Sequence, residues 1–487
     1  MIEETGLSAI VGSDNIDRTR ASLDAYSRDI SFVSPVEPAC VVKVHDAETI
    51  QKLVKLARET NTPLIPVSSG APHFRGDTVP STGGAIIVDL SGMKRIIHIS
   101  RKHRMAMFEP GVTFGELIEA VGKEGLRLNV PLAPRKHKSV LGSLLEREPV
   151  IMPIYHWDIG DPIGCAEIVF GNGEVFRTGA AAGPGTLEQQ WAAGGSQKEA
   201  AGPSSSSMYR LIQGAQGTMG IVTWVSARCE ILPRLEVSYF IGSSSLSRIT
   251  DTLHWLVRLR LANECLVLNN VNAAALVAQS AKEYQTLKDS LPPWVLFFNS
   301  AAYDYFPEER IDGQLEDMLG VTQRIGVEAV SVLGYLKAAD FLEVVRRPSA
   351  EAYWKTRSKG ASEDIFFITI YEQLEAQIKA MYETADSVGV PASDIGVYLQ
   401  PLVQGVNCHC EFNVFYNAEN RSEADRVKRL SALAIRSQMS HGAFFSRPYG
   451  PNVEVIMNRD AASVNALRKI KAITDPKNIM NPGKLCF

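Results

Sequence analysis

The fold of this chain is decided by a short apolar strand that runs directly into a turn of small residues. The strand and turn read Ile65-Pro66-Val67-Ser68-Ser69-Gly70-Ala71-Pro72-His73-Phe74-Arg75-Gly76, followed by Thr82-Gly83-Gly84 and an apolar strand at 85–90. Such a turn exposes main-chain N–H groups in a concave nest, which binds pyrophosphate because no bulky side chain blocks the approach. An ordinary loop between two strands is the alternative interpretation of this stretch alone.

The length and composition are those of a globular protein with more than one folding unit. The 487 residues are 45% apolar and 21% charged. A chain of this length is expected to form two or three compact units. The formal net charge of -4 provides no basic field for nucleic acid. We therefore expect a small-molecule substrate and no nucleic-acid partner.

The cysteines predict a reducing compartment. They are scattered, odd in number and free of any Cys-x-x-Cys pair, so neither a disulfide framework nor an iron–sulfur cluster is encoded. The first residues lack a basic segment followed by an apolar one, and no apolar run approaches the roughly 18 residues of a spanning helix. The expectation is a cytoplasmic protein without a membrane span.

The first part of the chain alternates between predicted strands and helices. An N-terminal arm at 1–37 contains a helix near 18–26 and precedes a strand at 40–44. Asp46 then caps a helix. One face of this helix carries Ile50, Leu53, Val54 and Ala57. Together with the strand at 64–67, these elements predict a β-α-β unit.

Later segments predict a hairpin, a turn and a long loop. Gly171-Asn172 lies between two strand-like segments, which is typical of a β-hairpin. A small-residue turn is expected at Ser139-Val140-Leu141-Gly142-Ser143. Residues 179–207 carry no apolar period and predict a long surface loop. Gly217 and Gly220 serve either tight packing or close approach of the backbone to a flat cofactor ring, and both interpretations stay open.

A change of pattern near residue 234 predicts a domain boundary. Beyond it, strands alternate with amphipathic helices that carry more charge. We expect one domain at 38–234, a second at 235–450 and a C-terminal segment at 451–487. The fold class predicted from this order of elements is α+β.

Five stretches, in order, resemble the FAD-binding signatures of the vanillyl-alcohol oxidase and p-cresol methylhydroxylase flavoprotein family. They are Pro66-Val67-Ser68-Ser69-Gly70, Phe108-Glu109-Pro110-Gly111-Val112, Gly171-Asn172-Gly173-Glu174-Val175, Gly217-Thr218-Met219-Gly220-Ile221-Val222-Thr223 and Asp475-Pro476 with Asn481-Pro482-Gly483-Lys484. The resemblance spans residues 38–234 and about the last thirty. Arg177-Thr178-Gly179 and the small residues after it are closer to the 4-alkylphenol-oxidising branch than to the glycolate oxidase and D-lactate dehydrogenase branch.

This resemblance implies FAD as cofactor and a two-part FAD-binding domain. It also implies a central cap domain with an antiparallel sheet, after which the C-terminal segment returns to the FAD domain. Residues 68–76 would wrap the pyrophosphate, 139–143 would line the isoalloxazine side, and Gly217, Gly220, Ile221 and Val222 would pack along the cofactor. Asn481 and Lys484 would lie near the flavin end. A shared fold does not determine the reaction, so the function has to be inferred from the residues of the site.

The substrate-binding residues depart from the family pattern. The phenol-oxidising members hold the substrate phenolate with two tyrosines and an arginine. This chain has Arg75 where one tyrosine belongs, and Ser446 before Arg447 where the other belongs. Two guanidinium groups facing a pocket favour a carboxylate, with Tyr449 assisting. The alternative is that Arg75 points to solvent or to the FAD phosphates.

His409 and Glu411 are the predicted proton-transfer residues. Members of the hydroxy-acid branch bind a metal through two histidines and a glutamate, but this chain has Leu402 and Ala443 at positions where ligands belong. We therefore expect no metal site. His409 is interpreted as a base or hydrogen-bond donor beside the flavin, and a structural histidine is the alternative. Glu411 shares its strand face and is the second candidate.

Covalent flavin attachment is common in the family and often uses a histidine of the pyrophosphate loop. His73 lies one position late for that pattern, since Pro72 occupies the expected slot. Non-covalent FAD is the expectation, and a link through His73 stays open. Asp161 is expected to stand in for an acidic residue that approaches the flavin.

These features predict an FAD-dependent dehydrogenase or oxidase acting on CH-OH or CH-CH groups. Its substrate would be a small alcohol-type or para-substituted phenolic molecule. A carboxylate on this substrate would suit the two arginines, Arg75 and Arg447. The first alternative is a flavin-bearing subunit of a multi-subunit electron-transfer complex related to glycolate oxidase and D-lactate dehydrogenase. A cytochrome or iron–sulfur subunit would then be the redox partner. The second alternative is a non-catalytic fold that has lost FAD. The sequence leaves homodimer formation open.

Overall fold

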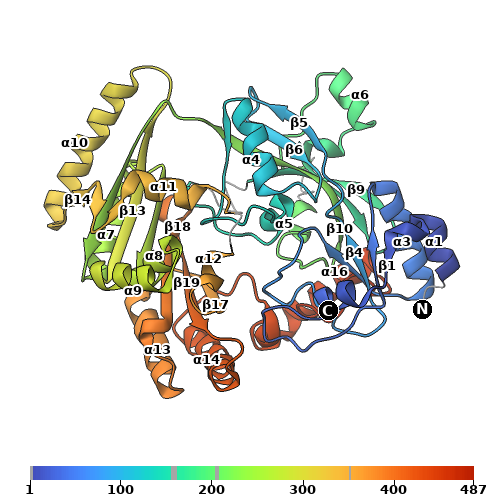
Figure 1. Cartoon of the computed structure of the whole chain (residues 1–487). Coiled ribbons are helices and arrows are strands. Elements are labelled where there is room, and N and C mark those ends of the chain that lie inside the picture. Colours follow the sequence, from blue (N-terminus) through green and yellow to red (C-terminus); the bar gives the residue numbers. More distant parts are fainter. Residues whose placement is uncertain (1–3, 155–161, 203–207, 350–351) are drawn as a thin grey trace.

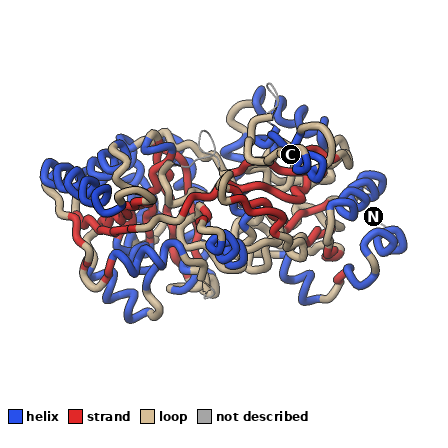
Figure 2. Tube along the Cα trace, turned by 90° about the horizontal axis from the view of Figure 1, so that it is seen from above, coloured by secondary structure: helices blue, strands red, loops and turns tan. Residues whose placement is uncertain are grey.

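Two sheets form the part of the molecule that contains both chain ends, and a third sheet forms the part farthest from them (Figures 1 and 2). The computed structural model describes residues 4–154, 162–202, 208–349 and 352–487. The predicted mixture of helix and sheet is confirmed. No helix within these described ranges is both long enough and apolar enough to span a membrane.

The candidate pyrophosphate loop follows the edge strand of the first sheet. Its strand order is β1-β2-β4-β3, with β2, β4 and β3 parallel. The predicted β-α-β unit is present, with β4 inserted between its two strands, and the helix begins after Asp46 and buries its predicted apolar face. The elements are β1 (Ile16–Asp17), β2 (Cys40–Lys43), β3 (Leu64–Val67), β4 (Ile86–Asp89), α1 (Glu4–Val11), α2 (Arg20–Ser27) and α3 (Ala47–Thr60).

The second sheet is antiparallel and is built around the long strand β10. Its order is β5-β6-β10-β8-β9, and β7 also pairs with β10. The hairpin predicted around Gly171-Asn172 joins β8 to β9. The elements are β5 (Ile96–Ser100), β6 (Met105–Phe108), β7 (Leu126–Leu128), β8 (Ile163–Phe170), β9 (Val175–Arg177), β10 (Gly220–Ile231) and α4 (Phe114–Lys123).

Two segments predicted to be irregular contain helices. The expected turn at 139–143 is instead the start of α5 (Val140–Leu145), because the Ser139 side chain accepts a hydrogen bond from the Gly142 N–H and caps the helix. Its apolar side chains are buried. The described part of the 179–207 loop contains α6 (Leu187–Ala192), which begins with a reciprocal cap between Thr186 and Gln189.

The cap is a seven-stranded antiparallel sheet covered by helices. Its order is β14-β11-β13-β12-β18-β19-β17, which confirms the expected antiparallel cap. The strands are β11 (Leu235–Ser243), β12 (Glu264–Asn269), β13 (Trp294–Ala302), β14 (Ala329–Val330), β17 (Ala361–Thr369), β18 (Ile395–Leu402) and β19 (Asn407–Tyr416), with a separate hairpin of β15 (Val332–Leu333) and β16 (Leu336–Lys337). The helices are α7 (Leu246–Arg258), α8 (Asn270–Val277), α9 (Ala281–Ser290), α10 (Pro307–Ile325), α11 (Ala338–Arg346), α12 (Trp354–Arg357), α13 (Leu374–Ser387) and α14 (Arg421–Ser440).

The cap and the FAD-side sheets share a continuous core. Phe108 of β6 and Phe240 of β11 belong to the same hydrophobic cluster. Arg127 of β7 also forms a 2.7 Å ion pair with Glu264 of β12. This contact fixes the cap over the edge from which the 68–76 loop emerges.

The C-terminal segment returns to the first sheet. After α15 (Val453–Met457) and α16 (Ala461–Thr474), Met480 bridges to Leu64 of β3, and the Asn481 N–H donates to the Leu64 carbonyl at 2.9 Å. Val464 of α16 is buried, whereas Leu467 and Ile470 on the same helix are half-buried. The chain end thus supports the strand that leads into the loop.

Candidate active site

A cleft of about 1390 Å³, counting its opening to solvent, lies between the two FAD-side sheets and the cap. Its walls come from the 68–76 loop, from α5 and from the segment before β10, and the cap contributes Tyr353 and Asp364. The predicted site residues that line it are Pro66, Val67, Ser68, Ser69, His73, Arg75, Gly142, Gly217, Gly220, Val222 and Tyr449.

The loop presents main-chain donors to this cleft. Among the described residues, the N–H groups between Ser68 and Arg75 donate to no protein acceptor, and Pro72 has no N–H to offer. The Gly76 N–H, by contrast, donates to Asp29 at 2.6 Å. A run of unused donors at the edge of a sheet is the arrangement that binds pyrophosphate oxygens. The nest interpretation therefore fits better than that of an ordinary loop.

Two glycines keep the cleft clear. Gly217 has a φ of 71°, and a Cβ on it would lie 2.6 Å from Pro66 Cγ. A Cβ on Gly142 would approach Ser68 Oγ to 3.0 Å. Side chains at these positions would push into the loop, so glycine is required for close packing along the cleft.

Several predicted cofactor residues support the cleft from behind. Lys484 Nζ donates to the Gly76 carbonyl at 2.7 Å, and Asn481 Nδ2 donates to the carbonyls of Asp77 and Gln216 at 2.8 and 2.7 Å. These bonds hold the loop against the segment before β10.

The other predicted cofactor residues that do not line the cleft are Gly70, Ala71, Pro72, Gly76, Ser139, Val140, Ser143 and Ile221. Asp161 lies outside the described residues.

His73 is a neutral imidazole at the cleft. Burial and the nearby Arg135 lower its pKa to about 4, and its ring stacks on Tyr26 with centroids 5.7 Å apart. Its buried Nε2 has no hydrogen-bond partner in the part of the chain that the structure describes. An unpaired buried nitrogen in a cleft is satisfied when a ligand fills the space. The residues present therefore fit an FAD molecule.

Arg75 is not the free substrate anchor that the sequence suggested. Its guanidinium pairs with Glu146 at 2.7 Å and with Glu148 at 3.1 Å, and Lys138 bridges the same two carboxylates. Burial would lower the pKa of Arg75, but these carboxylates hold it well above its ordinary value. The Arg75 side chain is 18% exposed, and its charge is already balanced by these carboxylates, although the residue lines the cleft and the inner chamber described next.

A smaller chamber of about 350 Å³ adjoins the cleft on the cap side. We call it the inner chamber. Its lining carries three cations and two carboxylates, and the ion-pair partners of these groups, Lys138, Glu146 and Asp364, bring the cluster to four cations and four carboxylates. The charged residues are Arg75, Lys355, Arg447, Glu148 and Glu411, and the others are Pro131, Leu132, Pro149, Tyr353, Trp354 and Tyr398.

Arg447 is the cation of this cluster that forms no ion pair with a described residue. It is 3% exposed, and its guanidinium stacks on the Phe366 ring at 4.3 Å. Its one hydrogen bond to a described residue is a 3.4 Å contact with the Glu146 carbonyl, and no carboxylate of the described residues lies within ion-pairing distance. Burial and the neighbouring Arg75 lower its pKa to about 10. A buried, unpaired cation is costly unless an anion joins it.

Glu411 lines the inner chamber, and His409 lies behind it. Both side chains point to one face of β19, as the strand period predicted, with His409 Nε2 at 3.0 Å from Glu411 Oε2. Glu411 also accepts hydrogen bonds from Lys355 and Asn413. Burial would raise the pKa of Glu411, but Lys355 and His409 hold it well below its usual range. Burial lowers the pKa of His409, which is neutral.

The sequence reasoning missed the residues that complete these two cavities. Lys355 bonds to both Asp364 and Glu411, and Tyr353 lines the cleft and the inner chamber. No motif marks them, because their partners are brought together only by cap topology. The carboxylates Glu146 and Glu148 were visible as a charged run after an apolar segment. Among the described residues, no group of three or more His, Cys, Asp or Glu side chains is placed to hold a metal ion.

Comparisons with known proteins agree with the cleft geometry. Residues 38–179 match the FAD binding domain, and residues 440–485 match the C-terminal domain of FAD linked oxidases. The chain is 23% identical to the 4-cresol dehydrogenase flavoprotein subunit of Pseudomonas putida, over 98% of this chain and 93% of that protein. It is 21% identical to the glycolate oxidase subunit GlcD of Bacillus subtilis, over 98% and 95%.

Solved structures give the same fold. The crystal structure of p-cresol methylhydroxylase with substrate bound superposes with a TM-score of 0.84, at 18% identity over 99% of this chain and 96% of that one. Both matched domains contribute residues to the cleft described above, and the loop that lines it has the donors an FAD pyrophosphate requires. The chain is therefore an FAD-linked oxidoreductase that carries these two domains and has the fold of p-cresol methylhydroxylase.

Proposed function

We propose that this oxidoreductase oxidises a small alcohol that carries a carboxylate near its reacting carbon. The observation that supports this is Arg447, a buried cation at the inner chamber with no carboxylate partner among the described residues. A substrate carboxylate would pair with its guanidinium through two parallel hydrogen bonds. Arg75 cannot serve as the second anchor, since Glu146 and Glu148 already hold it.

The cap side of the site would accept the proton released from the substrate hydroxyl. Bound FAD supplies the redox chemistry by accepting the hydride that the substrate carbon loses. As the carbonyl forms, the hydroxyl proton passes to the ionised Glu411. The neutral His409 donates its Nε2–H to Glu411 Oε2 at 3.0 Å and orients this carboxylate. Lys355 keeps Glu411 ionised and oriented before the reaction.

Anaerobic flavin reduction distinguishes between the two substrate classes. Mandelate carries the carboxylate and the alcohol, whereas 4-ethylphenol carries the para-substituted phenol that also suits the family. We expect mandelate to bleach the flavin of the FAD-loaded protein and 4-ethylphenol to leave it oxidised. Bleaching by 4-ethylphenol alone would assign the chain to phenol oxidation.

A second candidate is the flavin-bearing subunit of an electron-transfer complex. Two relatives are themselves named as subunits, a 4-cresol dehydrogenase flavoprotein subunit and a glycolate oxidase subunit. A cytochrome or iron–sulfur protein would then reoxidise the flavin. Turnover with an artificial acceptor but not with oxygen would favour this candidate, and rapid peroxide formation would favour a free-standing oxidase.

A further inference from the structure

Tyr353 lies where the cavities of this protein meet. It directly precedes α12, and of the described residues it alone lines the cleft, the inner chamber and a third cavity on the outer side of the cap. It is one of five residues that line both the cleft and the inner chamber, where Arg447 lies. No sequence motif marks the position.

The ring of Tyr353 is held from three directions. Phe74 of the loop packs edge-on at 5.4 Å between centroids, and Trp354 packs edge-on at 6.0 Å. The Arg135 guanidinium lies 5.9 Å from the ring centroid. These contacts come from the loop, from α12 and from the segment before α5. They fix the ring and hence the position of its hydroxyl.

The hydroxyl itself is unused. Among the described residues it has no hydrogen-bond partner, although the residue lies mostly within the protein. Burial raises the pKa of Tyr353 to about 12, so the hydroxyl keeps its proton and acts as a donor. Arg447, which lines the same inner chamber, is also a donor without an anionic partner. Two donors without partners at one chamber can bind the oxygen atoms of an anion.

We infer that Tyr353 is a substrate-binding residue whose hydroxyl donates a hydrogen bond to the carboxylate held by Arg447. This inference rests on the proposed function, because it assigns both donors to the same anionic group. Arg447 supplies charge, and Tyr353 fixes the orientation of the carboxylate plane relative to the cleft. An amide of the same shape accepts only neutral hydrogen bonds at its carbonyl and therefore gains less from the two donors than a carboxylate does.

The test uses Tyr353→Phe, which removes the hydroxyl and keeps the ring contacts. Binding of benzoate to the FAD-loaded protein is followed through the change in flavin absorbance, with benzamide as the neutral probe. We expect Tyr353→Phe to weaken benzoate about tenfold, the effect of one lost charge-assisted bond. Benzamide binding should weaken less than benzoate binding, and the FAD dissociation constant should stay unchanged. Tyr335→Phe, at a tyrosine that is 77% exposed, is the matched control.

The possible results of this experiment separate the role of Tyr353 from the carboxylate site itself. If Arg447→Ala weakens benzoate but Tyr353→Phe does not, the role of Tyr353 is wrong and the carboxylate proposal stands. If Tyr353→Phe weakens benzoate and benzamide equally, the side chain acts through packing alone and the inference is overturned. If benzoate perturbs neither the wild-type flavin nor its reduction by mandelate, the anion site is wrong, and the inference falls together with the proposed function.

Discussion

The guanidinium carbon of Arg447 lies 4.3 Å from the centroid of the Phe366 ring, which holds a buried cation in place without neutralising it. We predict that Arg447→Ala weakens benzoate binding by one to two orders of magnitude. The reason is that hydrogen bonds to charged groups contribute about 1.5–3 kcal/mol. The dissociation constant from flavin absorbance measures the effect.

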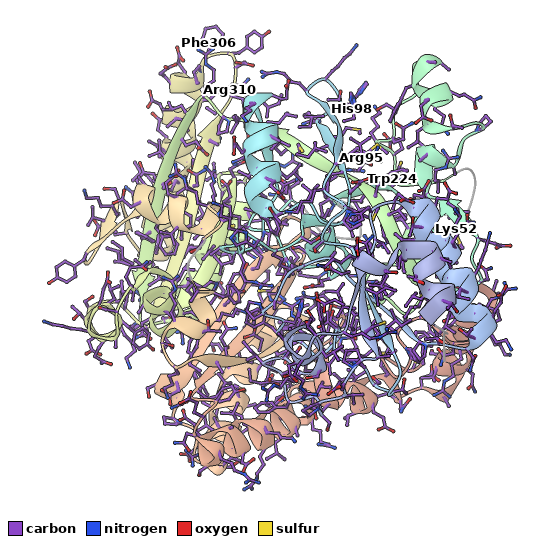
Figure 3. All side chains as sticks on the ribbon, turned by 45° about the vertical axis from the view of Figure 1, so that its right-hand side comes forward. Lys52, Arg95, His98, Trp224, Phe306 and Arg310 are labelled. Carbon is purple, nitrogen blue, oxygen red and sulfur yellow. The ribbon has the colours of Figure 1, made fainter. Side chains whose placement is uncertain are left out.

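Arg310→Ala is the control for that substitution. Arg310 is exposed on α10, near Phe306 at the far end of the cap (Figure 3). Its removal should leave benzoate affinity unchanged. Arg447→Lys should give an intermediate affinity, since an ammonium keeps the charge but cannot form the parallel pair of bonds. Equal affinity in wild type and Arg447→Ala would remove the case for a carboxylate anchor.

Arg75 is predicted to stabilise the fold and not to bind substrate directly. Arg75→Ala leaves Glu146 and Glu148 with Lys138 as their remaining cation. We expect a loss of about 2 kcal/mol in the free energy of unfolding, below the 3–5 kcal/mol of a fully broken buried pair because Lys138 stays. Urea unfolding of the FAD-loaded protein measures it.

The matched control is the exposed pair on α3. Lys52 and Glu48 lie 2.7 Å apart with side chains 58% and 75% exposed, and Lys52 is labelled in Figure 3. Lys52→Ala should cost less than about 1 kcal/mol, as exposed pairs do. An Arg75→Ala protein as stable as Lys52→Ala would show that the Glu146–Glu148 cluster does not depend on Arg75.

The carboxyl group of Glu363 should make the free energy of unfolding depend on pH. Burial raises its pKa to about 7, against the hydrogen bond that the Ser431 hydroxyl donates at 2.6 Å. The folded state thus holds a proton that the unfolded chain releases near its usual pKa of about 4.3. Stability from this group is present below about pH 4 and is lost as the pH rises toward 7.

Glu363→Gln removes this titration. Relative to wild type, the variant should gain stability of the order of 1 kcal/mol between pH 4 and pH 8. Denaturant unfolding at the two pH values gives the difference. A constant difference between the two proteins at both pH values would contradict the raised pKa.

The link between FAD and the chain is predicted to be non-covalent. His73 is the candidate for attachment, but it lies one position beyond the expected slot and its ring stacks on Tyr26. Acid precipitation should therefore leave a yellow supernatant and a colourless pellet. A yellow pellet that becomes colourless in His73→Ala would establish the covalent bond instead.

Local signals predicted the parts of the fold that local chemistry controls. Asp46 caps its helix, because capping depends on neighbouring residues, and the small residues after Val67 leave their main-chain N–H groups without a protein acceptor among the described residues. The segment 139–143 was misjudged because its small residues suggested a turn, whereas Ser139 caps α5 and its apolar neighbours are buried.

The site depended on contacts between distant segments. Arg75 meets Glu146 and Glu148 some seventy positions later, and that pairing reverses its predicted role. The contacts of Tyr353 form only when the cap folds over the loop, since its partners come from three separate segments. Residue type and spacing identified Arg447, Glu411 and His409 but did not indicate which of them reach a cavity.

The most direct test compares how fast two substrates reduce the flavin anaerobically in wild type and in Arg447→Ala. Mandelate and benzyl alcohol share the ring and the alcohol, and only mandelate carries the carboxylate. We predict that mandelate reduces the wild-type flavin at least tenfold faster than benzyl alcohol does, and that Arg447→Ala abolishes this preference. Equal rates for the two alcohols in wild type, or a preference that survives Arg447→Ala, would contradict carboxylate anchoring by Arg447.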